Sequence, residues 1–200
     1  MKKIMILFIS TFLMAAPSFA EPLVIDQEVP DFTLQDTEGN TVSLSDFKGE
    51  TVVLEWSNPD CPFVVKHYGS GNMQQLQNYY GEAGIKWLII ASSAPGKQGH
   101  YSAEEWNAII QKQEAGPAAV LLDPTGEVGR LFNAKTTPHM YIINEERELL
   151  YQGAIDSKNS ANPEDIASST NYVSEALDAL LADEQIEITE TRAYGCSIKY

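Results

Sequence analysis

The sequence predicts an α/β protein with a mixed sheet, a parallel core and helices on both faces. Two observations support this prediction. Short apolar runs alternate along the chain with segments whose apolar residues recur at helical spacing, an order typical of parallel strands joined by crossover helices. The run IKWLIIA, residues 85–91, is almost wholly apolar, as expected for a strand covered on both faces. A hairpin and a closing helix are predicted after this alternating region.

The first 20 residues have the pattern of a secretory signal peptide. Lys2 and Lys3 precede an apolar stretch at 4–16, and residues 18–20 form a small-residue cleavage site. Because the apolar stretch is too short for a convincing membrane span, we expect a mature protein that begins at Glu21 and has no membrane span. Export across an inner membrane is predicted, to the periplasm or, as the alternative, to the extracellular medium.

The mature chain is strongly acidic. The full sequence carries 13 basic and 28 acidic residues, and loss of Lys2 and Lys3 lowers the net charge from −15 to −17. This charge argues against nucleic acid and anionic membrane surfaces as partners. About 180 mature residues have the size of one domain, which we expect at 21–185, followed by a C-terminal tail at 186–200.

An N-terminal hairpin extension is predicted to precede the central strand. Residues 32–34 and 41–44 alternate between apolar and polar side chains around the turn 36–40, which is typical of a hairpin. A short helical turn is expected at 45–49. The central strand is predicted at 52–56, because this short run is rich in residues that favour strands.

The later elements follow from capping residues, turns and apolar periodicity. The helix that begins at residue 62 is expected to be interrupted at 69–71, where two glycines flank a serine. Ser102 provides the N-cap of a further helix, whose first turn contains the acidic residues Glu104 and Glu105. In chain order we then predict a helix through 73–79, the strand 85–91, a helix from 102, a strand at 118–122, a short helix at 128–132, a hairpin of 140–143 with 149–152, and a closing helix at 173–181.

Cys61 lies at the corner between the central strand and the first helix. Residues 57–60 supply four turn residues, and Pro62 suits the first helical position because its φ is preset and it has no backbone N–H. At such an N-cap the free amides and the helix dipole favour a thiolate, and can lower a cysteine pKa to roughly 3.5–7.5. The corner is a poor place for burial, so we expect a reactive thiol rather than an inert core residue.

Charged neighbours modify this expectation. Lys66 or His67 would add to the stabilisation of a thiolate, whereas Asp60 would oppose it. For His67 itself we expect an exposed helix position. The three histidines are scattered and, with only two cysteines, show no zinc-type spacing, so no metal and no cofactor are predicted.

The two cysteines leave three alternatives open. Both Cys61 and Cys196 remain after removal of the signal peptide, and an oxidising compartment permits one disulfide. In the first alternative Cys196, on a tail with Gly195 and Ser197, folds back and resolves an oxidised Cys61. In the second the pair forms a permanent structural disulfide, which would stabilise the fold by about 4–5 kcal/mol because it closes so long a loop. In the third the two thiols never meet.

Several stretches resemble a known family. VVLEWSNPDCPFV, residues 52–64, resembles the strand and active-site turn of the thioredoxin fold, and Thr137-Pro138 resembles its cis-proline loop. VPDFTLQDTEGNTVSLSDFKGETVVL, residues 29–54, resembles the opening of the redoxin (AhpC/TSA) branch. Within that branch the chain is similar to a peroxiredoxin-like group with a CPFV turn, here 61–64, and a GCSIK tail, here 195–199.

The resemblance implies a thioredoxin-like fold and roles for particular residues. Cys61 takes the place of the nucleophile, and Glu55, six residues earlier, takes the place of a buried acid that transfers protons. A partly exposed strand glutamate is the alternative for Glu55. The resemblance also implies a cis bond before Pro138. The residues expected to bind substrate are Pro62, Phe63, Thr137 and Pro138.

Two departures limit the resemblance. Val64 stands where the second cysteine of Cys-x-x-Cys would be, so a vicinal disulfide cannot form. The peroxiredoxin pattern Pro-x-x-x-Thr-x-x-Cys is absent, because Leu54 and Asn58 occupy its proline and threonine positions. Fast peroxidase chemistry at Cys61 therefore lacks its usual supports.

Taken together, these residues predict an exported thiol oxidoreductase with Cys61 as nucleophile. Its partner would be a protein with thiols or disulfides, or a small thiol or peroxide, and its electron donor is not identified by the sequence. A peroxiredoxin-type thiol peroxidase is the nearest alternative. The alternative from another class is a non-catalytic binding protein, such as a metal or partner chaperone, with a structural disulfide.

Overall fold

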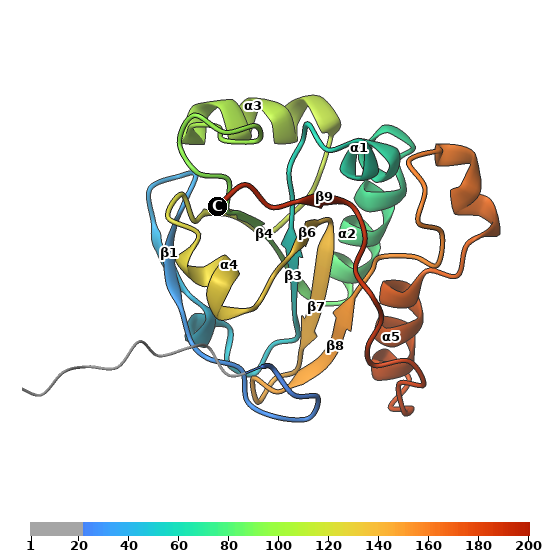
Figure 1. Cartoon of the computed structure of the whole chain (residues 1–200). Helices are drawn as coiled ribbons and strands as arrows, with labels where there is room; N and C mark the ends of the chain where they lie inside the picture. The colour runs from blue at the N-terminus through green and yellow to red at the C-terminus, as the bar shows by residue number, and fades with distance from the viewer. Residues whose placement is uncertain (1–21) are drawn as a thin grey trace, which may run out of the picture.

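Seven β-strands form one mixed sheet in the structure, a computed structural model that describes residues 22–200 (Figure 1). The strand order is β2-β1-β5-β4-β3-β7-β8. β3, β4 and β5 run parallel, whereas β1 and β7 pair with them antiparallel. The strands are β1 Thr33–Asp36, β2 Thr41–Ser43, β3 Val52–Trp56, β4 Lys86–Ala91, β5 Ala119–Leu122, β7 His139–Ile143 and β8 Leu149–Gly153. The predicted mixed sheet with a parallel core and an N-terminal hairpin is confirmed.

The signal peptide predicted at 1–20 lies outside the described residues. Within residues 22–200, no helix has both the length and the apolar character needed to cross a membrane.

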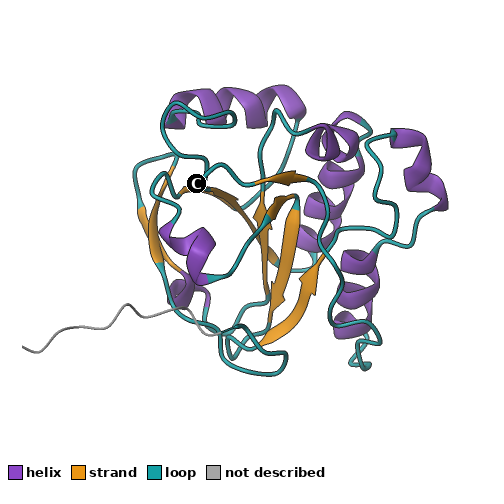
Figure 2. Ribbon diagram, in the orientation of Figure 1, coloured by secondary structure: helices purple, strands orange, loops and turns teal. Residues whose placement is uncertain are grey.

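Within residues 22–200, five α-helices and two 3₁₀ helices surround the sheet, as Figure 2 illustrates. Apolar residues of α1, α2, α3 and α5 enter one core, and those of α4 and η1 enter a second core on the other face. The predicted cap of α3 is confirmed, because the Ser102 side chain accepts a hydrogen bond from the Glu105 amide. The helices are η1 Leu44–Phe47, α1 Pro62–Gly69, α2 Asn72–Glu82, α3 Ala103–Gln113, α4 Glu127–Leu131, η2 Pro163–Ser168 and α5 Tyr172–Leu181.

The central strand β3 separates the two cores. All five of its residues are buried, and their side chains alternate between the two faces, as strand geometry requires. Val53 joins the core beneath α1, α2 and α5, whereas Leu54 and Trp56 join the core on the α4 face. This buried strand holds the turn that carries Cys61 in a fixed place.

The C-terminal residues 186–200, which we call the strap, form an ordered segment beyond α5. Two residues of the strap, β9 (Cys196–Ser197), pair antiparallel with β6 (Thr136–Thr137). Further backbone bonds run from Ile198 N to Lys135 O at 3.1 Å and from Ala94 N to Lys199 O at 2.8 Å. Figure 1 shows this red segment rising beside α5 and crossing next to β6. The sequence predicted a tail here, but not this strand pairing.

Tyr200, the last residue, anchors the end of the strap against α4. Its hydroxyl donates to the Ala134 carbonyl at 2.7 Å, and the Arg130 guanidinium lies 4.6 Å from its ring centroid. Gly129 permits this approach, because a Cβ at that position would overlap the Tyr200 hydroxyl. The strap is therefore fastened at both its strand and its terminal side chain.

Candidate active site

Cys61 occupies the N-cap of α1, as the sequence predicts. Its backbone is extended, with φ −78° and ψ 122°, and Pro62 follows at the first helical position. The Cys61 carbonyl accepts hydrogen bonds from Val64 N at 2.9 Å and Val65 N at 2.8 Å. Two amides of the first turn of α1 therefore point toward Cys61 and bind its carbonyl, and the Val64 amide also favours the Cys61 thiolate.

The expectation that this corner would leave Cys61 accessible is wrong, because the side chain is 0% exposed. The reason lies in segments distant in sequence. The Cys61 thiol donates to the Thr137 carbonyl oxygen at 3.0 Å, and the strap lies over the same loop through the β6–β9 pairing. Tertiary contacts thus cover a turn that local sequence alone would leave open.

Thr137 connects the two cysteines. The Thr137–Pro138 bond is cis, as the resemblance implies. In the β6–β9 register Thr137 lies opposite Cys196, while its carbonyl accepts the Cys61 thiol. Gly195 allows the strap to come this close, because a Cβ there would overlap the Thr137 carbonyl oxygen. The structure thus brings Cys196 to Cys61, with the two sulfurs unbonded.

The surroundings of the two thiols shift their pKa values in opposite directions. Burial raises the pKa of Cys61, but the side chains of Cys196 and Thr137 and the amides of Val64 and Cys196 favour its thiolate, so that its pKa is lowered overall. Burial, with the hydrogen bond to Cys61 and the charge of its thiolate, raises the pKa of Cys196 to about 11. Cys61 is therefore the better nucleophile of the pair.

Lys66 and His67 do not act on Cys61 as expected. Lys66 donates to Asp156 Oδ2 at 2.8 Å, and both side chains are buried. His67 is also buried rather than on an exposed helix face, with Nε2 3.7 Å from the same carboxylate oxygen. The Tyr194 hydroxyl donates to the other oxygen of Asp156. Asp156 therefore connects α1, which begins next to Cys61, with the strap, two residues before Cys196.

Glu55 is a buried acid in β3, which excludes the partly exposed alternative. The Tyr68 hydroxyl lies 3.0 Å from Oε1 and 3.1 Å from Oε2, and Trp87 Nε1 donates to Oε2 at 2.9 Å. Burial raises its pKa, although these hydrogen bonds oppose the rise. Among residues 22–200, no hydrogen bond joins Glu55 to Cys61 directly, and its role in proton transfer remains a prediction.

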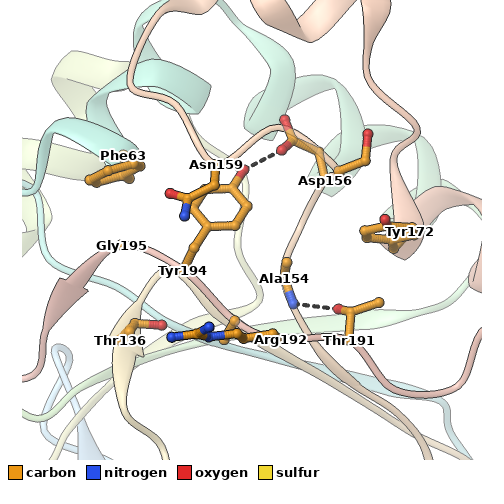
Figure 3. A pocket seen from close by; sticks show the side chains of 12 residues that line it. Phe63, Thr136, Ala154, Asp156, Asn159, Tyr172, Thr191, Arg192, Tyr194 and Gly195 are labelled. Carbon is orange, nitrogen blue, oxygen red and sulfur yellow. Dashed lines mark hydrogen bonds between the residues drawn. The ribbon is translucent and has the colours of Figure 1, made fainter.

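A cavity of about 550 Å³ has residues close in sequence to both cysteines in its lining, and Figure 3 shows the side chains that line it. Three of its lining residues adjoin the site directly, namely Phe63, Thr136 and Gly195. Of the residues predicted to bind substrate, only Phe63 lines this cavity. Pro62 is exposed, whereas Thr137 and Pro138 are buried. The full lining is Phe63, Thr136, Ala154, Asp156, Ser157, Asn159, Tyr172, Thr191, Arg192, Ala193, Tyr194 and Gly195.

Sequence reasoning did not identify Asp156, Arg192, Tyr194 or Tyr200. The last three belong to the strap, and their proximity to Cys196 in the sequence was an available signal. Asp156 follows β8 and carries no comparable signal, because its partner Lys66 is 90 residues away.

Comparisons with known proteins agree with this fold. The model of the AhpC/TSA family matches residues 25–152. The thiol-disulfide oxidoreductase ResA of Bacillus thuringiensis is 24% identical over 135 residues, which cover 66% of this chain and 70% of that protein.

Two solved structures share the fold. One, an uncharacterized conserved protein from Geobacillus kaustophilus, has a TM-score of 0.75 and 26% identity, with 94% of this chain and 98% of that chain covered. The other is a putative thiol:disulfide interchange protein DsbE from Chlorobium tepidum, with a TM-score of 0.54 and 25% identity over 65% of this chain and 84% of that chain. The thioredoxin-like fold predicted from the sequence is confirmed.

Proposed function

The chain belongs to the AhpC/TSA family, and from that premise we propose that it is an exported thiol oxidoreductase with Cys61 as nucleophile and Cys196 as resolving cysteine. One observation carries the proposal. The Thr137 carbonyl that accepts the Cys61 thiol belongs to the residue directly opposite Cys196. The oxidoreductase names of the ResA and DsbE relatives support the same chemistry.

The proposed reaction transfers two electrons to a substrate disulfide. The Cys61 thiolate attacks one substrate sulfur, which forms a mixed disulfide and releases the first substrate thiolate. Cys196, once deprotonated, attacks the Cys61 sulfur and releases the second substrate thiolate. The products are a Cys61–Cys196 disulfide and two substrate thiols, and a dithiol or two thiols must then reduce the protein.

Two residues assist this exchange in the proposal. Thr137 positions both cysteines, and its buried Oγ1 has no hydrogen-bond partner among the described residues, so it is free to support the Cys61 thiolate. Glu55 accepts or supplies protons in this exchange, because burial raises its pKa above that of a free carboxyl. Substrate reaches the Cys61 sulfur only after the strap moves, since this sulfur is fully buried.

Export is proposed on the sequence pattern of residues 1–20. Fractionation of expressing cells, followed by mass determination of the N-terminus, tests it. We expect a mature chain that starts at Glu21 outside the cytoplasm. An uncleaved chain in the cytoplasm would contradict export without affecting the proposed chemistry.

The decisive experiment combines alkylation and trapping. In the Cys196→Ser variant, the alkylation rate of Cys61 is measured against pH. A separate sample of the reduced variant, not alkylated, is mixed with a small disulfide such as hydroxyethyl disulfide. We expect a stable mixed disulfide on Cys61 by mass spectrometry, whereas the wild type passes on to the Cys61–Cys196 disulfide. The Cys61→Ser variant is the control and should trap much less.

Other outcomes would assign a different function. If the Cys61–Cys196 disulfide is reduced only under denaturing conditions, the disulfide is structural. The alternative of a non-catalytic binding protein then replaces the proposed enzyme. If hydrogen peroxide oxidises Cys61 far faster than any disulfide does, the peroxidase alternative replaces disulfide exchange.

A further inference from the structure

The two cysteines differ in how an external reagent can reach them. Cys61 is fully buried, whereas Cys196 is only partly buried. The cavity beside the pair is lined by Gly195, the residue immediately before Cys196, and by Phe63, two residues after Cys61. Neither cysteine lines the cavity itself, but a reagent that enters it lies next to the residue that precedes Cys196, the less buried cysteine of the pair.

Among the described residues that line this cavity, Arg192 is the one basic side chain (Figure 3). Its side chain is exposed, and no acidic side chain within residues 22–200 lies at ion-pair distance from its guanidinium. The acid in the cavity, Asp156, is already neutralised by Lys66 at 2.8 Å and hydrogen-bonded by Tyr194. The positive charge of Arg192 therefore remains available to a ligand.

The unpaired positive charge of Arg192 contrasts with the strongly acidic character of the chain. The mature chain carries a net charge of −17 if the signal peptide is removed, so its general field repels anions. A guanidinium presents several N–H donors in a planar fork that matches a carboxylate. Aromatic side chains complete the cavity, with the Phe63 and Tyr194 rings 5.7 Å apart. The lining thus suits a small molecule with a short apolar part and a carboxylate.

We propose that this cavity binds a small anionic thiol through Arg192, and that this thiol reduces the Cys61–Cys196 disulfide by attacking Cys196. The inference rests on the proposed function and supplies the electron donor that it needs. The site is formed by the strap and the start of α1, so it exists only when the strap is in place.

The electron balance is that of two successive exchanges. The donor thiolate attacks the Cys196 sulfur, forms a mixed disulfide there and expels Cys61 as its thiolate. A second donor thiolate attacks the mixed disulfide, which releases Cys196 and one molecule of donor disulfide. Two donor thiols are oxidised and one protein disulfide is reduced. Attack at Cys196 expels Cys61 as its thiolate, which the Thr137 side chain and the amides of Val64 and Cys196 favour, and a stabilised leaving group favours this direction.

The test compares three small thiols on the oxidised wild-type protein: mercaptoacetate (anionic), 2-mercaptoethanol (neutral) and cysteamine (cationic). Release of Cys61 is followed by acid quenching, alkylation and mass spectrometry. Each rate is divided by the rate of the same thiol with hydroxyethyl disulfide, which removes differences in thiol pKa and nucleophilicity. The variants are Arg192→Gln and Arg192→Lys, with Lys112→Gln on α3 as a control that removes one exposed positive charge elsewhere.

We expect Arg192→Gln to slow mercaptoacetate about fivefold, the size of an exposed ion pair, and to leave 2-mercaptoethanol within twofold. Arg192→Lys should retain part of the preference, and Lys112→Gln should match the wild type. Equal loss for all three thiols, or a mercaptoacetate rate that Arg192→Gln does not change, would overturn the anionic donor. A mixed disulfide found on Cys61 would overturn attack at Cys196. A protein whose disulfide resists all three thiols and dithiothreitol would instead refute the proposed function.

Discussion

The Cys61 thiol and the Thr137 carbonyl oxygen lie 3.0 Å apart although 76 residues separate them in the sequence. Because Thr137 also pairs with Cys196 across β6 and β9, the position of the strap determines both the access to Cys61 and the distance between the thiols. Perturbing the strap should therefore have opposite effects on two measurable rates.

Removing the Tyr200 side chain should loosen the strap. Tyr200→Ala eliminates the hydrogen bond to Ala134 and the contact with Arg130. We expect Cys61 to react with iodoacetamide about tenfold faster, because the strap covers Cys61 in a smaller fraction of the molecules. The Cys61–Cys196 disulfide should form more slowly. Both rates are measured on the reduced protein by quenching and mass spectrometry. Unchanged rates would show that the β6–β9 pairing alone retains the strap.

A second variant displaces Tyr200 without changing the strap itself. In Gly129→Ala the new Cβ would overlap the Tyr200 hydroxyl, so the ring must move from its position on α4. We expect the same direction of change in both rates as for Tyr200→Ala. The control is Gly81→Ala on α2, where a Cβ meets nothing within 4 Å. If the two glycine variants behave alike, helix propensity rather than displacement of Tyr200 explains the result.

Most of the fold was predictable because its signals are local. The apolar run of β4, the turn residues before Cys61 and the capping residues of α3 lie next to the elements that they specify. The two-residue strand β9 has no such signal, since its partner β6 lies about 60 residues earlier and neither strand is long enough to show periodicity.

The site was predictable only where one residue carries the chemistry. Cys61, Glu55 and Pro138 follow from the turn and from the family resemblance. The burial of Cys61 and His67 depends instead on long-range contacts with the cis-proline loop, the strap and Asp156, and no local pattern encodes them. For the same reason the expected effect of Lys66 on the thiolate was wrong, because its true partner lies after β8.

Asp156 should be critical for stability. Asp156→Asn leaves Lys66 charged, buried and without its carboxylate, which costs about 3–5 kcal/mol of unfolding free energy. The double variant Asp156→Asn with Lys66→Met removes the unpaired charge and should recover most of this loss. Urea unfolding at pH 7 measures both. A double variant as unstable as the single one would mean that packing, and not the unpaired charge, dominates.

His67 should make the protein less stable in mild acid. Burial lowers its pKa to about 4 in the folded state, so the unfolded chain, with a histidine pKa near 6.5, binds the proton more tightly. Stability is then lost as pH falls from about 6.5 to about 4, by up to roughly 3 kcal/mol. His139, whose pKa burial lowers to about 3, contributes to the same window.

The measurement is the unfolding free energy of wild type and His67→Gln at several pH values between 4 and 7. The difference between the two proteins removes the contribution of His139. We expect this difference to shift in favour of His67→Gln as the pH falls. Parallel curves would indicate that His67 has the same pKa in the folded and the unfolded chain, so that its burial does not disfavour the charged form.

Glu55 should affect resolution of the mixed disulfide rather than its formation. Glu55→Gln removes the titratable group but can keep its amide oxygen at the Oε2 position, which accepts from both Tyr68 and Trp87. Cys196 must lose a proton before it attacks the mixed disulfide, because burial raises the pKa of its thiol, and an internal base speeds that step. We expect closure of the Cys61–Cys196 disulfide to slow about tenfold near pH 7, with the deficit shrinking toward high pH, where hydroxide serves instead. The alkylation rate of Cys61 should stay within twofold. Slowing of both reactions by the same factor at every pH would instead assign Glu55 a purely structural role beneath the turn.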